Sequence, residues 1–173
     1  MSQFFINGKF LNQNISGVQR YAHGILKYLE LVQTAKPKIK SLLLQMLWEQ
    51  VQLPLQLKKS GNPLLLNFCN TAPFYYRNQI VTIHDMAVFE DPTWFSKPFA
   101  AYYKFMLPRI SQNSKHIVTV SAFSKSEIQK HLKVPSDKIS VIYPGLDADL
   151  TAKISKKPTA INSKFILLVG SHD

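Results

Sequence analysis

Cysteine and acidic residues are scarce in this chain. Of its 173 residues a single one is cysteine, Cys69, which excludes an internal disulfide and a cysteine-rich metal site. Ten Asp and Glu residues stand against 21 Lys and Arg residues, which gives a net charge of +11. Such a basic surface favours anionic partners, whether nucleic acid, phosphorylated metabolites or acidic lipid headgroups, and it does not choose among them.

Long apolar runs are also missing. The longest, such as Leu64–Leu66 and Phe165–Val169, are far too short to cross a bilayer. The N-terminus has no basic segment followed by a long apolar core, so no signal peptide is expected. We therefore expect a cytoplasmic location, either in solution or peripheral at the inner face of the plasma membrane. The apolar content of 46% excludes a wholly disordered chain.

Short apolar runs alternate with longer amphipathic ones, which is typical of α/β proteins. Phe4–Phe10 and Leu42–Leu44 are predicted strands, and Thr34–Lys40 is a predicted basic loop. Four runs lack a clean alternation of polar and apolar residues, as expected for strands buried on both faces of a parallel sheet: Leu64–Phe68, Ile80–Ile83, Ile117–Val120 and Ile139–Tyr143. The pattern predicts a parallel α/β sheet.

Helices are predicted between these strands. A capping box of Ser16 and Gln19 places the start of the first helix near Gly17. Three later helical segments are predicted: Trp48–Lys59, Pro98–Asn113 and Ser124–Leu132, the last opened by a capping box at Ser124. Pro54 should break or kink the first of these helices, and Pro108 the second.

The chain changes character after residue 150. Thr151–Lys164 contains four lysines, no acid and no aromatic residue, so a linker is predicted there. Residues 165–173 begin with another strand of the buried type, Phe165–Val169, with no chain left to cover it. We therefore expect a first domain over residues 1–150 and the first strand of an absent second domain at the end.

Ligands of open parallel sheets bind beyond the carboxyl ends of the strands. His84 and Asp85 follow one predicted strand, and Ser121 follows another. Gly17 opens a helix whose free N–H groups suit a phosphate, and Arg20 on that helix faces either the same crevice or solvent. For each residue a structural role stays open: a buried histidine with satisfied hydrogen bonds, a turn aspartate, a strand-ending serine and a cap glycine.

Other chemistries lack their motifs. The five histidines show no metal-ligand spacing, and there is no Walker loop, no G-x-G-x-x-G and no nucleophile elbow. Tyr102–Phe105 interleaves aromatic and basic residues as nucleic-acid modules do, although on a helix it favours one buried face. With Trp94 and Phe95 the same stretch also suits a membrane interface.

Six segments, taken together and in order, resemble glycosyltransferase family 4 of the bacterial surface-polysaccharide type: Asn14–Tyr21, Leu47–Pro54, Cys69–Pro73, Val81–Phe89, Val120–Glu127 and Val141–Gly145. The resemblance implies the GT-B fold, built of two Rossmann-like halves, of which this chain is the acceptor-side half. It implies transfer of a hexose, often mannose, from a nucleotide-sugar to a polysaccharide or lipid-linked acceptor. The resemblance also implies that the transferred sugar retains its anomeric configuration and that the reaction needs no metal or other cofactor.

The resemblance also implies roles for individual residues. His84 would touch the donor sugar, Gly17 would lie against the donor diphosphate, and Asp85 and Ser121 would shape the cleft. The family's donor-phosphate residues and its two glutamates come after the strand at residues 165–169. We therefore expect a truncated chain that is inactive alone and needs a separate donor-domain chain. Family members usually place a strand and a crossover between Gln33 and Met46, so the resemblance further predicts that a segment is deleted there.

Two alternatives remain from the sequence. The chain is either the acceptor half of such an enzyme or a non-catalytic remnant that keeps the acceptor-binding cleft. Binding of nucleic acid through the basic surface is the weakest interpretation.

Overall fold

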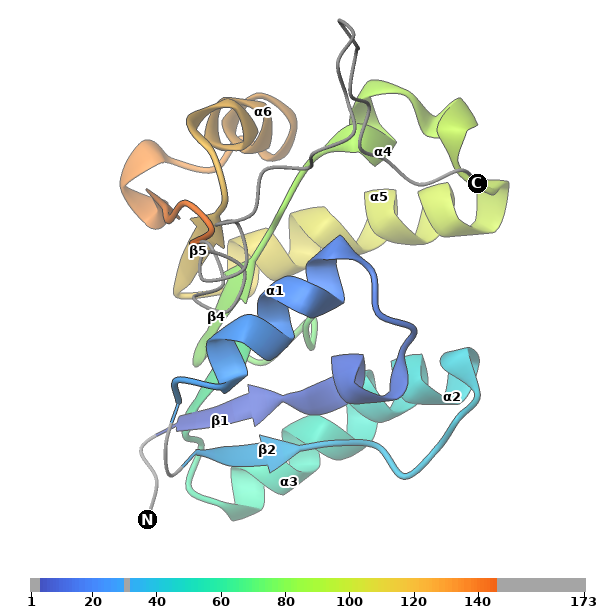
Figure 1. Cartoon of the computed structure of the whole chain (residues 1–173), viewed down its shortest axis with the longest axis vertical. Helices are drawn as coiled ribbons and strands as arrows, with labels where there is room; N and C mark the ends of the chain where they lie inside the picture. The colour runs from blue at the N-terminus through green and yellow to red at the C-terminus, as the bar shows by residue number, and fades with distance from the viewer. Residues whose placement is uncertain (1–3, 30–31, 146–173) are drawn as a thin grey trace, which may run out of the picture.

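The computed structural model describes residues 4–29 and 32–145 of the chain (Figure 1). Within these residues the strands form one parallel six-stranded sheet in the order β2-β1-β3-β4-β5-β6. The strands are β1 (Phe4–Asn7), β2 (Gln33–Ala35), β3 (Leu64–Asn67), β4 (Gln79–Thr82), β5 (His116–Thr119) and β6 (Ile139–Val141). The predicted parallel α/β sheet is confirmed.

Helices connect the strands in the Rossmann-like manner, except that no helix lies between β3 and β4 in the described part of the chain. They are α1 (Gly17–Leu26), α2 (Leu42–Leu47), α3 (Leu53–Lys59), α4 (Ala87–Glu90), α5 (Lys97–Asn113) and α6 (Ala122–Leu132). Short 3-10 turns occupy Gly8–Asn12, Pro92–Trp94 and Ser136–Lys138, and a π turn, η2, occupies Trp48–Gln52.

Helices cover both faces of the sheet, because successive residues of a strand point to opposite sides. In β1, Phe5 packs with Leu53 and Leu57 of α3, whereas Ile6 packs with Ala22 of α1. The ribbon shows α1 and α3 on opposite sides of β1, above and below it in the view of Figure 1. The prediction of helices on both faces is therefore confirmed.

The other half of the sheet buries one face under α5 and α6. Val81 of β4 and Ile117 of β5 share a core cluster with Leu107 of α5 and Ile128 of α6. The strand register aligns Leu65 of β3 with Gln79 of β4. Val81 lies two residues after Gln79, so its side chain is on the same face of the sheet as Leu65, which is the face that α3 covers. Among the described helices, α1 alone lies on the opposite face.

Two predictions between the first helix and residue 47 are wrong. Leu42–Leu44 opens helix α2 and is not a strand, although all three side chains are exposed. Within the predicted loop Thr34–Lys40, the first two residues belong to β2, which pairs with β1 at the sheet edge. Only Ala35 of this strand is buried, so its composition carries no apolar signal. The strand predicted to be deleted is therefore present.

Neither proline ends its helix. Helical structure runs without a gap from Leu42 to Lys59, and Pro54 lies in the first turn of α3, directly after the π turn. There the N–H of Leu53 donates to the carbonyl of Trp48, five residues back, so the helix widens where the proline enters. Pro108 lies inside α5, which continues to Asn113 because buried Leu107 and Ile110 anchor it to the core.

One predicted cap is confirmed and one is wrong. α1 begins at Gly17, with the N–H of Ser16 donating to Oε1 of Gln19 at 3.2 Å. α6 begins at Ala122, and its N-cap is Ser121, whose Oγ accepts from the N–H of Ser124 at 3.0 Å. Ser124 therefore lies inside the helix and does not cap it.

The predicted linker at residues 151–164 and the predicted strand at 165–173 lie outside the described residues, so the domain boundaries stay a prediction. Over residues 4–29 and 32–145, no helix is long and apolar enough to cross a membrane.

Candidate functional site

A pocket of about 370 Å³ lies at the carboxyl edge of the sheet. The segments that follow β1, β3 and β4 converge there, as expected for a ligand site in an open parallel sheet. The loop before α1 and the residues after β3 and β4 supply its polar side, which consists of Gln13, Ser16, Gln19, Asn70, Thr71 and Asp85.

An aromatic wall faces these polar groups. The rings of Phe95 and Phe99 stack at 5.4 Å between centroids, and those of Phe99 and Tyr103 stack at 4.3 Å. All three line the pocket together with Val88 and Leu107. An apolar wall opposite a few convergent polar groups suits a ligand that combines a flat apolar face with several hydroxyl groups.

His84 sits directly behind this pocket. Its Nε2 lies 2.8 Å from the carbonyl oxygen of Phe68, and its ring meets that of Tyr21 edge-on at 4.8 Å. Because a carbonyl only accepts, Nε2 carries the ring proton and Nδ1 is left as an acceptor. No described residue hydrogen-bonds Nδ1. His84 itself does not line the pocket, but its neighbours Asn70 and Asp85 do.

Burial lowers the pKa of His84, while the Phe68 carbonyl and Asp85 oppose this shift. The folded state therefore holds fewer protons than the unfolded chain, whose histidines titrate near pH 6.5. We expect the free energy of unfolding to fall as the pH is lowered through about 6.5. Urea unfolding at pH 7.5 and 5.5 should show a smaller loss in His84→Gln than in the wild type. Equal losses in both proteins would contradict this expectation.

The structure brings Asp85 and the loop around Gly17 to one pocket. Asp85 lines it and accepts the N–H of Ala87 at 3.1 Å, while Gly17 lies between the lining residues Ser16 and Val18. Arg20 is exposed and is not among the lining residues. The hydroxyl of Ser121 is engaged at the start of α6, 3.0 Å from both N and Oγ of Ser124.

The single cysteine also lines the pocket. Burial raises the pKa of the Cys69 thiol to about 12, so it stays protonated at neutral pH. Because the thiolate is the nucleophilic form, Cys69 is not poised for nucleophilic attack.

A buried polar network adjoins the pocket at Thr71, and no sequence motif predicted it. Glu49 on the π turn is fully buried, and its carboxylate pairs with the ammonium group of Lys9. Its Oε1 accepts from Nδ2 of Asn7 at 2.7 Å and from the hydroxyl of Thr71 at 2.9 Å. The network continues to Asn67, whose Oδ1 accepts from Asn7 at 3.0 Å.

The π turn thereby fixes the segment that follows β3. Thr71 is held by Glu49, and Nε2 of the next residue, Gln50, donates to the carbonyl of Ala72 at 3.1 Å. Oε1 of Gln50 accepts from the N–H of Phe74 at 2.9 Å. These contacts position Asn70 and Thr71 in the pocket wall. Asn70 and Thr71 both follow a predicted strand, and this position could have marked them as candidate site residues.

An acidic cluster lies outside the pocket. Carboxylate oxygens of Glu90 and Glu127 and a ring nitrogen of His131 are close enough to share an ion. Nζ of Lys130 already pairs with Glu90 at 2.6 Å and with Glu127 at 3.2 Å. Hydrogen bonding with Glu127, Lys130 and His131 lowers the pKa of Glu90 to about 2. These contacts indicate a surface ion-pair cluster.

The sheet and the pocket together define the class of domain: a Rossmann-like α/β domain with its candidate ligand site at the carboxyl edge of the strands. The family model of Glycosyltransferase Family 4 matches residues 28–150. The chain therefore belongs to glycosyltransferase family 4, and the predicted resemblance is confirmed.

A curated relative supports the bacterial polysaccharide type. The chain is 33% identical over 114 residues to the O-antigen chain mannosyltransferase RfbU of Salmonella typhimurium. The match covers 65% of this chain and 30% of the relative. The matched part of the chain thus spans less than a third of the length of this relative.

Proposed function

We propose that this chain is the acceptor-side half of a hexosyltransferase, with mannose as the transferred sugar. The donor is a nucleotide-sugar, and the acceptor is a polysaccharide or a lipid-linked glycan. The similarity to an O-antigen chain mannosyltransferase supports this choice of sugar and acceptor class. Transfer proceeds with retention of configuration and without a metal or other cofactor.

The observation that carries the proposal is the mixed polarity of the pocket. The stacked rings of Phe95, Phe99 and Tyr103 give the pocket an apolar wall against which the apolar face of a sugar ring can pack. Asp85 and Asn70 on the opposite side are placed to accept and donate hydrogen bonds to its hydroxyls. This combination fits an acceptor glycan better than it fits a nucleotide phosphate.

The predicted site residues differ in how well their positions around this pocket fit their predicted roles. His84 acts on the donor sugar through Nδ1, and the N–H groups at Gly17 receive the donor diphosphate. Arg20 and Ser121 stay at the rim. The proposal includes no nucleic acid: Tyr102 and Tyr103 are half-buried, and the exposed ring of Phe105 already lies under the guanidinium group of Arg109.

The chain works at the inner face of the plasma membrane, where a lipid-linked acceptor resides. Its net charge of +11 supports contact with anionic lipid. The donor nucleotide is held by the family's second half, so we expect the 173 residues to need that half for turnover. A second function is acceptor binding without transfer, through the same pocket.

The test is sugar transfer from nucleotide-activated mannose to a lipid-linked glycan. We expect none from the purified 173-residue chain and transfer once a family 4 donor half is added. In that active preparation Phe99→Ala should raise the KM for the acceptor about tenfold, the equivalent of about 1.4 kcal/mol of lost stacking and burial. The matched control is Phe123→Ala, since Phe123 is exposed and outside the pocket.

The outcomes separate the candidates. Transfer by the chain alone would disprove the need for a donor half. Glycan binding without transfer under any condition would favour the binding module. An unchanged KM in Phe99→Ala would remove the acceptor from this pocket.

A further inference from the structure

The outer side of α2 and α3 carries an apolar stripe that no described residue covers. Leu43, Leu47, Val51 and Leu55 recur every four residues and are between 54% and 65% exposed. Leu42 and Leu44 beside them are exposed as well. We call the four residues Leu43, Leu47, Val51 and Leu55 the α2–α3 stripe. The inner side of the same helical run buries Trp48, Leu53 and Leu57 in the core.

The uninterrupted helical run explains why the stripe stays on one side. Residues four apart drift slowly around an ordinary helix of 3.6 residues per turn. The wider π turn at Trp48–Gln52 reduces that drift midway, so Leu55 stays in line with Leu47. The stripe is therefore a continuous surface along this helical run.

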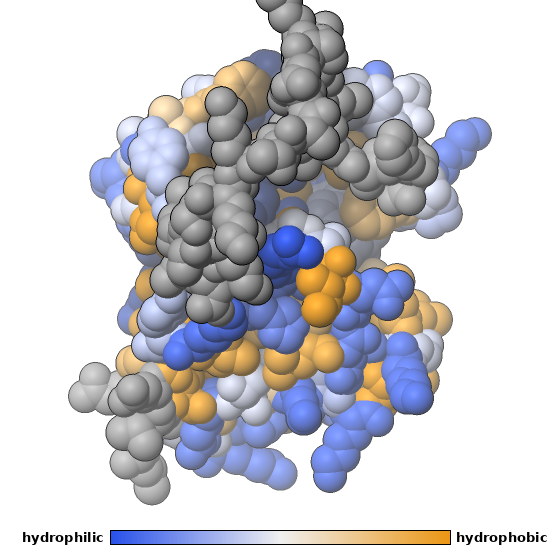
Figure 2. Space-filling model, viewed as in Figure 1, coloured by the Kyte–Doolittle hydropathy of each residue, from blue (hydrophilic) through white to orange (hydrophobic). Residues whose placement is uncertain are grey.

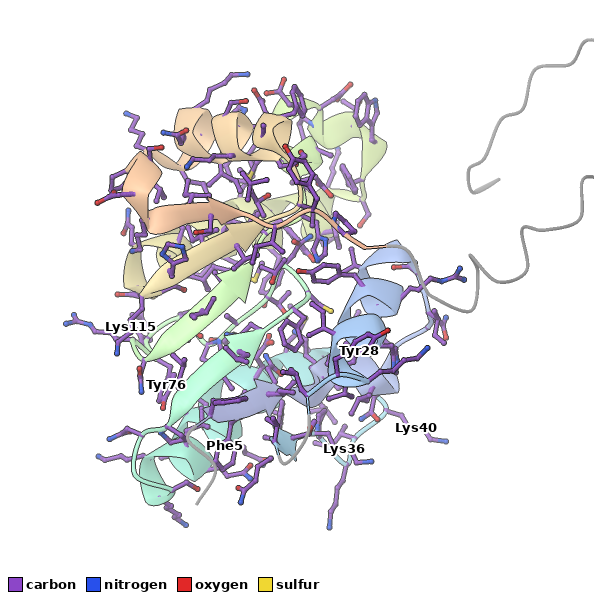
Figure 3. The ribbon with its side chains drawn as sticks, turned by 60° about the vertical axis from the view of Figure 1, so that its left-hand side comes forward. Phe5, Tyr28, Lys36, Lys40, Tyr76 and Lys115 are labelled. Carbon is purple, nitrogen blue, oxygen red and sulfur yellow. The ribbon has the colours of Figure 1, made fainter. Side chains whose placement is uncertain are left out.

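Lysines lie at both ends of the stripe. Lys36, Lys38 and Lys40 precede α2 and are exposed, and Lys58 and Lys59 end α3. Figure 3 shows the side chains of Lys36 and Lys40 projecting outward from the ribbon. On the face shown in Figure 2, hydrophobic and hydrophilic surface lie side by side over the part of the molecule where Figure 1 places α2.

The basic segment is held in place. Nδ2 of Asn12 donates to the carbonyl of Pro37 at 2.6 Å, and Nε2 of Gln45 donates to the carbonyls of Ile39 and Lys40 at 3.0 and 3.1 Å. Between residues 32 and 76 the one acidic residue is Glu49, which is buried. The stripe and its flanks thus present apolar and positive groups without an exposed carboxylate.

We propose that the α2–α3 stripe and its flanking lysines form the surface that docks this chain on an anionic lipid bilayer. Leucine and valine enter the boundary between headgroups and acyl chains, and the lysines pair with lipid phosphates. The proposal rests on the peripheral location proposed above and adds the surface responsible for it.

A second copy of the chain fits this surface less well. Two stripes paired in either direction bring lysine-rich ends against lysine-rich ends. Protein interfaces also rely on tryptophan, tyrosine and arginine anchors, and the stripe contains none of them.

The test is cosedimentation of the 173-residue chain with vesicles of phosphatidylglycerol and phosphatidylcholine, compared with phosphatidylcholine alone. We expect binding to the anionic vesicles that weakens at high salt. Leu47→Gln/Val51→Gln/Leu55→Gln should lower the partition coefficient at least tenfold at low salt. Lys38→Gln/Lys40→Gln should lower it several-fold and flatten the salt dependence. Each single glutamine variant is measured too, in case the triple variant does not fold.

Matched controls remove the same groups elsewhere. Phe123→Gln removes an exposed apolar side chain from α6, and Lys97→Gln/Lys133→Gln removes two exposed lysines from outside the stripe. Both should bind vesicles nearly as the wild type does. Equal losses in the controls and the stripe variants would overturn the assignment of the surface.

Two further results would also overturn the proposal. The first is an absence of wild-type binding to anionic vesicles at low salt. The second is self-association in sedimentation that the stripe variants abolish. Vesicle binding is measured without donor or acceptor. A failure to bind vesicles would therefore not count against the proposed transfer reaction, which is tested in its own assay. Wild-type binding that survives in every stripe variant would preserve the peripheral location and reject this surface.

Discussion

Replacement of Glu49 by alanine is expected to cost about 3–5 kcal/mol of folding free energy, because it strands a buried charge. Lys9 is nearly as buried as Glu49, and its ammonium group has the Glu49 carboxylate as its ion-pair partner. The change also leaves the amide of Asn7 and the hydroxyl of Thr71 without their acceptor. For a chain of this size the melting temperature should fall by about 10 °C or more.

Two variants control this result. Glu90→Ala removes a carboxylate that also pairs with a lysine, but on the surface, and little change in stability is expected. Adding Lys9→Met to Glu49→Ala should recover part of the loss, since the stranded charge is gone. Urea unfolding of the four proteins provides the measurement. A Glu49→Ala protein as stable as Glu90→Ala would show that the buried pair contributes nothing.

Replacement of His84 by alanine is expected to lower the rate of glycosyl transfer by about 10²–10⁴-fold, the range for a positioned catalytic group. The ring is held by the Phe68 carbonyl and the edge of Tyr21, and Nδ1 has no hydrogen-bond partner among the described residues. The preparation must be active, with a donor half supplied. The alanine variant also leaves the Phe68 carbonyl unpaired, which costs about 1–3 kcal/mol of stability.

His84→Gln separates catalysis from this structural role. The amide of glutamine can still donate to the Phe68 carbonyl, but it cannot replace the ring nitrogen Nδ1. If His84 acts on the donor sugar, the glutamine variant stays folded and is nearly as slow as the alanine variant. If the glutamine variant keeps full activity, His84 is a buried histidine with a structural role only.

The local patterns were informative where they concerned close neighbours in the chain. The capping box at Ser16 and Gln19 correctly predicted the start of α1, because both partners lie within one helical turn. The runs without alternation correctly predicted parallel strands. Burial on both faces was not found for β5 and β6, because in the described residues α5 and α6 cover one face only and Ser140 of β6 is exposed. The ends of the predicted strands also indicated the edge of the sheet at which Asp85 and the loop around Gly17 meet.

The same patterns failed where a distant contact decided the outcome. Leu42–Leu44 looks like a strand by composition, yet it forms a helix in which Gln45 and Trp48 are buried and the leucines remain outside. Strand β2 is nearly invisible in the sequence, because its place depends on pairing with β1 and only Ala35 is buried.

What the sequence by itself determined is therefore the class of the sheet, the places of β1, β3, β4, β5 and β6 along the chain, and the edge of the sheet where the candidate site lies. The tertiary structure alone decided the burial of Glu49 with Lys9, the aromatic wall of the pocket and the hydrogen bond of His84 to Phe68. The physical reason is the range of the interactions. Periodicity and caps reflect forces within a few residues, whereas an ion pair across 40 residues leaves no local trace.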